Sequence, residues 1–146
     1  MPEGIDKQKI WRSGMNFTSE HSFLKMVRRD IHRVSTVKGF YSVSLQYCKL
    51  PSDQPPALVY FDCDYYSSTH EALIWIGPHL RHGSLIAFDD WDCFFGDENR
   101  GQRLAFKNFR EAMKERFVFT EFFKIKSGGM SYICLEKSKI GTSFGG

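Results

Sequence analysis

Four aspartates stand in two pairs, and each pair directly follows a short apolar run. Asp62 and Asp64 follow the first run, and Asp89 and Asp90 follow the second. Carboxylates gathered in one place raise one another's pKa unless a cation or a proton offsets their charge. Because carboxylate oxygens are the ligands that Mg²⁺ prefers, the two pairs predict a divalent-cation site. One carboxylate could remain to act as a general base.

The two apolar runs, Ala57–Phe61 and Ser84–Phe88, predict strands that lie side by side in a parallel sheet. Neither run alternates with polar residues, which is typical of a strand buried on both faces. Apolar positions at helical spacing between the runs predict a helix, so the segment forms a βαβ unit. Ligands bind outside the carboxyl ends of such strands. In an extended backbone, Asp62 and Asp64 would point to the same side.

Aspartate is also a common turn and N-cap residue, and this is the alternative explanation for each of the four. For a single aspartate the capping role would be favoured. Two clusters on adjacent strands favour a functional site, although short motifs give many false positives.

Further elements complete an α/β fold. Apolar spacing predicts a helix from Ser19 to Arg33, a short strand at Val34–Val37 and an amphipathic helix at about 105–116. Two β-rich runs, Phe117–Ile125 and Met130–Glu136, are separated by a turn that ends in two glycines, and they predict an antiparallel hairpin.

The chain has 146 residues and ordinary globular composition, which suits one domain with one core. We place this domain at residues 1–137. Residues 1–18 are expected to form an irregular arm, and residues 138–146 a flexible tail.

The net charge, the cysteine spacing and the hydropathy of the chain indicate which partners and which compartment to expect. The net charge of +3 is small and spread along the chain, so it gives no reason to expect a nucleic-acid partner. The four cysteines form no CxxC pair, which fits a reducing compartment. No run approaches the roughly 18 apolar residues of a membrane span, and the first residues lack the apolar core of a signal peptide. We therefore expect a cytoplasmic protein without a membrane partner.

Several short motifs stand in a fixed order along the chain. They are Asp62-Cys63-Asp64-Tyr65-Tyr66-Ser67-Ser68-Thr69, Gly77-Pro78, His82-Gly83-Ser84, Phe88-Asp89-Asp90-Trp91, Gly101-Gln102 and Ala105-Phe106, with Met1-Pro2-Glu3-Gly4, Trp11 to Gly14 and Lys38-Gly39-Phe40 upstream. Together with the terminal hairpin, this order resembles the C-terminal portion of the macrocin O-methyltransferase family. That family belongs to the class I S-adenosylmethionine-dependent methyltransferases, which have a Rossmann-like sheet.

The resemblance implies a role for each aspartate. Asp62, Asp89 and Asp90 would bind Mg²⁺ or a similar divalent cation, and Asp64 would take the proton from the hydroxyl of a sugar or similar small molecule. Metal coordination lowers the pKa of such a hydroxyl and holds its oxygen in line with the methyl group.

Five further residues are candidates around this site. Gly39 and Phe40 are cofactor-binding candidates by the same resemblance. Trp91, Phe94 and Phe95 follow Asp90 in a loop that could cover the acceptor or could pack on the sheet edge. Three histidines, His70, His79 and His82, are expected to be surface or capping residues rather than metal ligands.

Two elements of the family pattern have no counterpart here. The first two strands, with the Gly-rich cofactor loop and the acidic residue that follow them, are absent, so a partial methyltransferase sheet is expected. The strand at 58–61 would then expose an apolar edge, which is a liability in a soluble protein. We expect either Val34–Val37 to pair with it or another chain, a second copy or a complementing one, to do so.

Two other functions fit part of the sequence. Glycosyltransferases use an apolar strand that ends in Asp-x-Asp to hold a metal and a nucleotide sugar, but this would leave Asp89 and Asp90 unexplained. A non-catalytic binding or assembly module derived from a methyltransferase is the third interpretation.

Overall fold

The computed structural model describes residues 4–7, 18–51 and 53–141. Its main elements in chain order are α1 (Glu20–Met26), α2 (Tyr41–Ser44), β1 (Leu58–Phe61), α3 (Tyr66–Ile76), β2 (Leu85–Phe88), α4 (Gly101–Ala112), β3 (Phe117–Ile125) and β4 (Gly129–Glu136). Short 3₁₀ turns at Gly4–Asp6, Arg28–Arg33, Leu45–Tyr47, Gly77–His79 and Lys137–Lys139 join them.

The four strands form one mixed sheet in the order β1-β2-β4-β3. β1 and β2 are parallel, and α3 lies between them in the chain. β4 pairs antiparallel with both β2 and β3, and the β3–β4 pair contains a register shift between Glu121 and Lys124. The predicted α/β class, parallel pair and terminal hairpin are therefore confirmed.

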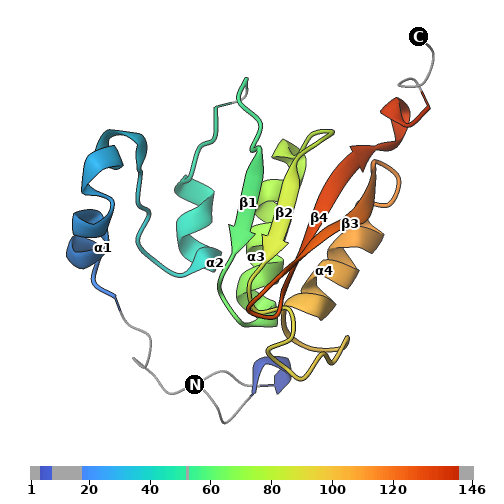
Figure 1. Ribbon diagram of the computed structural model, residues 1–146, viewed down its shortest axis with the longest axis horizontal. Helices are drawn as coiled ribbons and strands as arrows, with labels where there is room; N and C mark the ends of the chain where they lie inside the picture. The colour runs from blue at the N-terminus through green and yellow to red at the C-terminus, as the bar shows by residue number, and fades with distance from the viewer. Residues whose placement is uncertain (1–3, 8–17, 52, 142–146) are drawn as a thin grey trace.

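Helices α3 and α4 cover one face of the sheet (Figure 1). Leu73 of α3 and Ala105, Phe106 and Phe109 of α4 are fully buried, because they recur at helical spacing on the inward side. The ring of Phe88 on β2 lies 4.9 Å from that of Phe106, and this pair is the centre of an aromatic core.

The opposite face of the sheet has no helix over it in the part of the chain that the structure describes (Figure 1). The strand register places Leu58, Leu85 and Ile133 in one row on this face. Leu58 is 57% exposed and Tyr60 is 51% exposed. The prediction that the run at 57–61 is buried on both faces is therefore wrong, because the described helices cover one face only.

The outer edge of β1 has no strand beside it among the described residues. The predicted strand at Val34–Val37 is wrong, since these residues have no regular structure, and they do not repair the edge. Pairing with another chain stays a prediction.

The predicted first helix begins where expected, with the Ser19 hydroxyl accepting a hydrogen bond from the Ser22 amide at 3.1 Å. It ends at Met26, and a 3₁₀ turn follows to Arg33. Of the predicted arm, residues 1–3 and 8–17 lie outside the described residues, as do residues 142–146 of the predicted tail.

Candidate functional site

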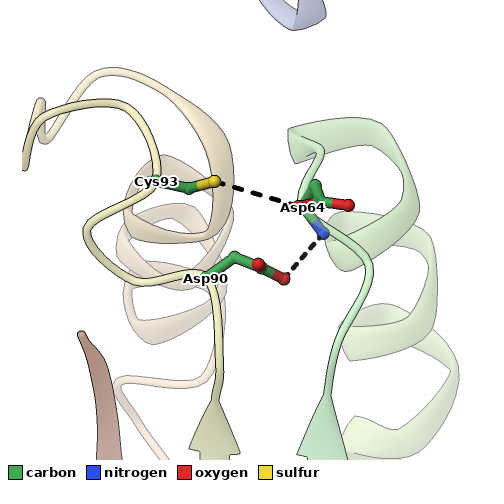
Figure 2. Close-up of side chains that lie close together, drawn as sticks. All are labelled: Asp64, Asp90 and Cys93. Carbon is green, nitrogen blue, oxygen red and sulfur yellow. Dashed lines mark hydrogen bonds between the residues drawn. The ribbon is translucent and has the colours of Figure 1, made fainter. Parts of the chain in front are cut away.

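The carboxyl ends of β1 and β2 bring the four aspartates into two overlapping groups. Ligand atoms of Asp62, Asp89 and Asp90 lie within 4.8 Å of one another, and so do those of Asp64, Asp90 and Cys93. Asp90 belongs to both groups and is the centre of the site. Figure 2 shows the second group, in which Asp64 comes from the loop after β1 and the other two residues come from the loop after β2.

Asp62 and Asp64 do not share a side of an extended strand, so that prediction is wrong. The strand ends at Phe61, and Asp64 has a φ of 52°, in the left-handed region that non-glycine residues seldom adopt. This backbone conformation turns Asp64 toward Cys93, whose thiol donates to Asp64 Oδ1 at 3.8 Å. Strained residues of this kind often occur at functional sites.

Asp90 is held by a donor from the neighbouring strand end. The backbone amide of Asp64 donates to Asp90 Oδ2 at 3.0 Å (Figure 2). Burial and then the nearby Asp64 carboxylate raise the pKa of Asp90 to about 6, against the lowering effect of that hydrogen bond. Burial, followed by Asp90 and Asp89, also raises the pKa of Asp62. The site therefore concentrates negative charge that a cation would neutralise.

Two tyrosines that the sequence reasoning missed lie beside these carboxylates. The Tyr60 hydroxyl donates to Asp89 Oδ1, and the Ser127 hydroxyl donates to the same oxygen at 3.3 Å. The hydrogen bond to Asp89 raises the pKa of Tyr60 to about 12. Burial and the nearby Cys63 and Asp62 raise the pKa of Tyr41. A tyrosine two residues before an Asp-x-Asp segment is a signal that could have identified Tyr60.

The start of α3 is capped from a distant part of the chain. Asp6 is buried, and its carboxylate accepts from the backbone amides of Tyr66 at 2.7 Å and Ser67 at 3.2 Å. The carbonyl of Lys7 also accepts from Arg100, just before α4. Residues 4–7 thus contact both loops that carry the aspartates. The prediction of an irregular arm did not anticipate these contacts.

The three aromatic residues of the loop after β2, Trp91, Phe94 and Phe95, differ in how far they are buried. Trp91 packs on Phe88 and Tyr132, with ring centroids 5.2 and 5.4 Å away, which favours the packing alternative for this residue. Phe94 lies under the Arg100 guanidinium at 4.5 Å. Phe95 is 94% exposed and could contact a ligand.

The cofactor candidates Gly39 and Phe40 lie in the turn before α2, where Phe40 is the N-cap residue and is exposed. No turn of the G-x-G-x-x-G kind leads from a strand into a helix within residues 4–7, 18–51 and 53–141. The described residues therefore fit a divalent cation, by their donor set and charge, but do not fit the nucleoside part of S-adenosylmethionine.

The three histidines lie away from both acidic groups. His70 stacks on Tyr66, the ring of His79 lies tilted against that of Trp75, and His82 Nδ1 accepts from the Glu136 amide at 3.2 Å. Among the described helices, none has the length and hydropathy required to cross a bilayer.

Comparison with known proteins shows the fold. No protein-family model and no curated protein matches the sequence. Sixteen chains of solved structures match, and one is the apo structure of a TDP-rhamnose 3'-O-methyltransferase, an enzyme in calicheamicin biosynthesis. It is 22% identical, with a TM-score of 0.53 over 77% of this chain and 51% of that chain. This chain thus has part of a methyltransferase-like α/β fold and spans about half the length of that protein, while membership of the macrocin family stays a prediction.

Proposed function

We propose that this chain forms the acceptor half of an O-methyltransferase that uses S-adenosylmethionine and a divalent cation to methylate a hydroxyl of a sugar or similar small molecule. The observation that carries the proposal is the meeting of four carboxylates at two adjacent strand ends, with Asp90 shared between both groups. The fold likeness to an enzyme named for methylating a sugar supports the choice of reaction.

In this proposal Asp62, Asp89 and Asp90 hold the cation, and Asp64 accepts the proton of the hydroxyl. A bound divalent cation would lower the pKa of the hydroxyl and fix the position of its oxygen. Asp64 suits the role of base because its carboxylate lies beside Asp90 but outside the group of three. Tyr60 and Ser127 would orient Asp89 through their hydrogen bonds.

The donor side is proposed to come from another polypeptide segment. β1 offers an unpaired edge, and the open face beside it carries Leu58 and Tyr60. A strand that pairs with β1, followed by an amphipathic helix on the open face, would cover both surfaces at once. If that strand runs parallel to β1, its carboxyl end would lie beside Asp62, where the donor must approach the acceptor.

Methyl transfer from labelled S-adenosylmethionine to a panel of sugars and nucleotide sugars tests the reaction. For the chain together with the segment that completes its donor side, we expect transfer that requires Mg²⁺, stops in EDTA and falls about 100-fold in an Asp64→Asn variant, because a general base contributes at least this much. Calorimetry should show that the variant still binds Mg²⁺. Equal rates with and without EDTA would contradict the proposed role of the metal.

A chain that transfers no methyl group alone can still be assigned by calorimetry. Binding of S-adenosylmethionine supports the methyltransferase. Binding of nucleotide sugar without S-adenosylmethionine supports the glycosyltransferase alternative. Binding of Mg²⁺ alone is expected of the acceptor half without its complementing segment, and binding of none of the three supports the non-catalytic module.

Sedimentation velocity tests whether β1 and the open face bind another chain. We expect the full chain to self-associate with rising concentration and a Leu58→Lys variant to associate at least about tenfold more weakly, because a charge on an apolar contact surface is desolvated on binding. Ile74→Lys, at an exposed position on α3, is the matched control. A full chain that stays monomeric and binds S-adenosylmethionine unaided would contradict the need for a partner.

A further inference from the structure

Gln102 is a buried polar residue in the first turn of α4, with only 1% of its surface exposed. The other side chains that this helix buries against the sheet, Ala105, Phe106 and Phe109, are apolar. An apolar residue at position 102 would serve helix packing equally well, and a buried amide is unfavourable unless its hydrogen bonds are made. The contacts of Gln102 therefore indicate what it does.

Its amide joins the ends of two strands. Gln102 Oε1 accepts from the Asp90 backbone amide at 2.9 Å, and Nε2 donates to the Phe61 carbonyl at 3.1 Å. Because a backbone amide can only donate and a carbonyl can only accept, these partners fix which end of the side chain is oxygen and which is nitrogen. Phe61 is the last residue of β1, and Asp90 lies two residues beyond the end of β2.

The same nitrogen also approaches the carboxylate at the centre of the site. Nε2 lies 3.4 Å from Asp90 Oδ2, the oxygen that accepts from the Asp64 amide. Asp90 is therefore held between Gln102 on one side and Asp64 on the other. The last backbone hydrogen bond between the two strand ends runs from the Asp89 amide to the Phe61 carbonyl at 2.9 Å. Gln102 donates to the same carbonyl and accepts from the next amide, that of Asp90, so it extends the connection between the strands by one residue.

We infer that Gln102 is a positioning residue of the site: it ties Asp90 to the end of β1, beyond the last backbone hydrogen bond between the strands, and thereby holds Asp90 against the Asp64 backbone. The contacts define this role within the chain, and its use in catalysis rests on the proposed function. Gln102 acts on Asp64 through Asp90, since its side chain hydrogen-bonds to Phe61 and Asp90 and not to Asp64 itself.

Amide hydrogen exchange of the metal-free full chain tests the inference without reference to catalysis. Gln102→Met keeps the length of the side chain and removes its hydrogen bonds. We expect the Asp64 amide to exchange at least about tenfold faster in this variant, although Gln102 does not touch it, because Asp90 Oδ2 is no longer held in place. Gln102→Glu keeps the acceptor for the Asp90 amide and loses both donations, so it should give the same result if Gln102→Met folds poorly.

Phe109→Leu is the matched control, since it disturbs the buried face of the same helix two turns away from the site. Rates are compared at equal global stability, set with urea. The inference is overturned if the Asp64 amide exchanges equally fast in the Gln102 variants and in Phe109→Leu.

Mn²⁺ affinity provides the second readout. We expect the Gln102 variants to bind Mn²⁺ about tenfold more weakly than the original chain, as is typical when a group that orients a metal ligand is removed, and Phe109→Leu to bind it equally well. If the unaltered chain binds no Mn²⁺, the proposed metal site fails, and the exchange rates still decide the role of Gln102.

Discussion

An Asp90→Asn variant is expected to lose divalent-cation binding and yet be more stable than the original chain at pH 7 in EDTA. Asp90 belongs to both carboxylate groups at the strand ends, so its replacement removes a ligand from either arrangement. We expect Mn²⁺ affinity to fall by about 100-fold or more, beyond the loss typical of a residue that only orients a ligand. Metal-dependent methyl transfer should fall with it.

The gain in stability follows from the pKa of Asp90, which burial and Asp64 raise to about 6. Since this pKa is above that of the unfolded chain, the ionised carboxylate destabilises the folded state at pH 7. The metal-free chain regains this stability as the pH falls through 6 toward 4. Asparagine is neutral throughout, and its amide oxygen can still accept from the Asp64 amide.

Thermal unfolding in EDTA at several pH values tests whether Asp90→Asn raises the free energy of unfolding. After a discount for the partial exposure of Asp90, the variant should be more stable by about 1 kcal/mol at pH 7. The difference should shrink as the pH falls toward 4. An Asp90→Asn variant that is less stable at pH 7, or that binds Mn²⁺ normally, contradicts the prediction.

Cys93→Ser is the matched control for the choice between the two carboxylate groups. Because Mn²⁺ and Mg²⁺ prefer oxygen ligands, we expect this variant to keep the affinity of the original chain. A loss comparable to that of Asp90→Asn would instead assign the ion to Asp64, Asp90 and Cys93.

Gly129→Ala is expected to cause a large loss of folding stability. A Cβ atom at this position would lie 2.4 Å from the carbonyl oxygen of Phe88 and 3.0 Å from the Ile125 side chain. The carbonyl belongs to the β2 backbone, which pairs with β4 at this point, so it cannot move without breaking that pairing. Overpacking against a rigid neighbour is unfavourable by about 3 kcal/mol.

Circular dichroism should show a melting temperature lower by roughly 10 °C for a chain of this length. Asp89 and Asp90 directly follow Phe88, so Mn²⁺ affinity should fall as well. Gly83→Ala is the control, because a Cβ there meets nothing within 4 Å and only its positive φ of 89° is unfavourable. It should destabilise the chain by about 1 kcal/mol and leave Mn²⁺ affinity unchanged. Equal effects of the two alanines would contradict the steric explanation.

Local patterns explain why much of the fold could be predicted. The β3–β4 hairpin depends on neighbouring residues and a glycine turn, and its strands begin and end within one residue of the prediction. The parallel pair follows from two apolar runs separated by one helix. The run at 34–37 has the same β-branched residues as a strand, but no described strand pairs with it, and residue preference alone does not form a sheet.

Other features of the site could not be predicted, because they depend on contacts between residues that are far apart in the sequence. The pairs of aspartates were visible in the sequence, but their division into two groups depends on the left-handed backbone of Asp64. Gln102 reaches Phe61 across 41 positions, and Asp6 reaches Tyr66 across 60. Apolar periodicity on α4 includes position 102, so a polar residue on the inward face was the available signal for Gln102.

The cap that Asp6 places on α3 makes the arm and the site thermodynamically coupled. Anything that orders the loop around Asp64 also favours the docked arm, and loss of the arm loosens that loop in return, because such coupling is reciprocal. The susceptibility of the chain to protease near Lys7 thus becomes a measure of how well the acidic site is ordered. We expect an occupied site to protect the peptide bonds near Lys7 from protease, and cleavage there to weaken binding at the site.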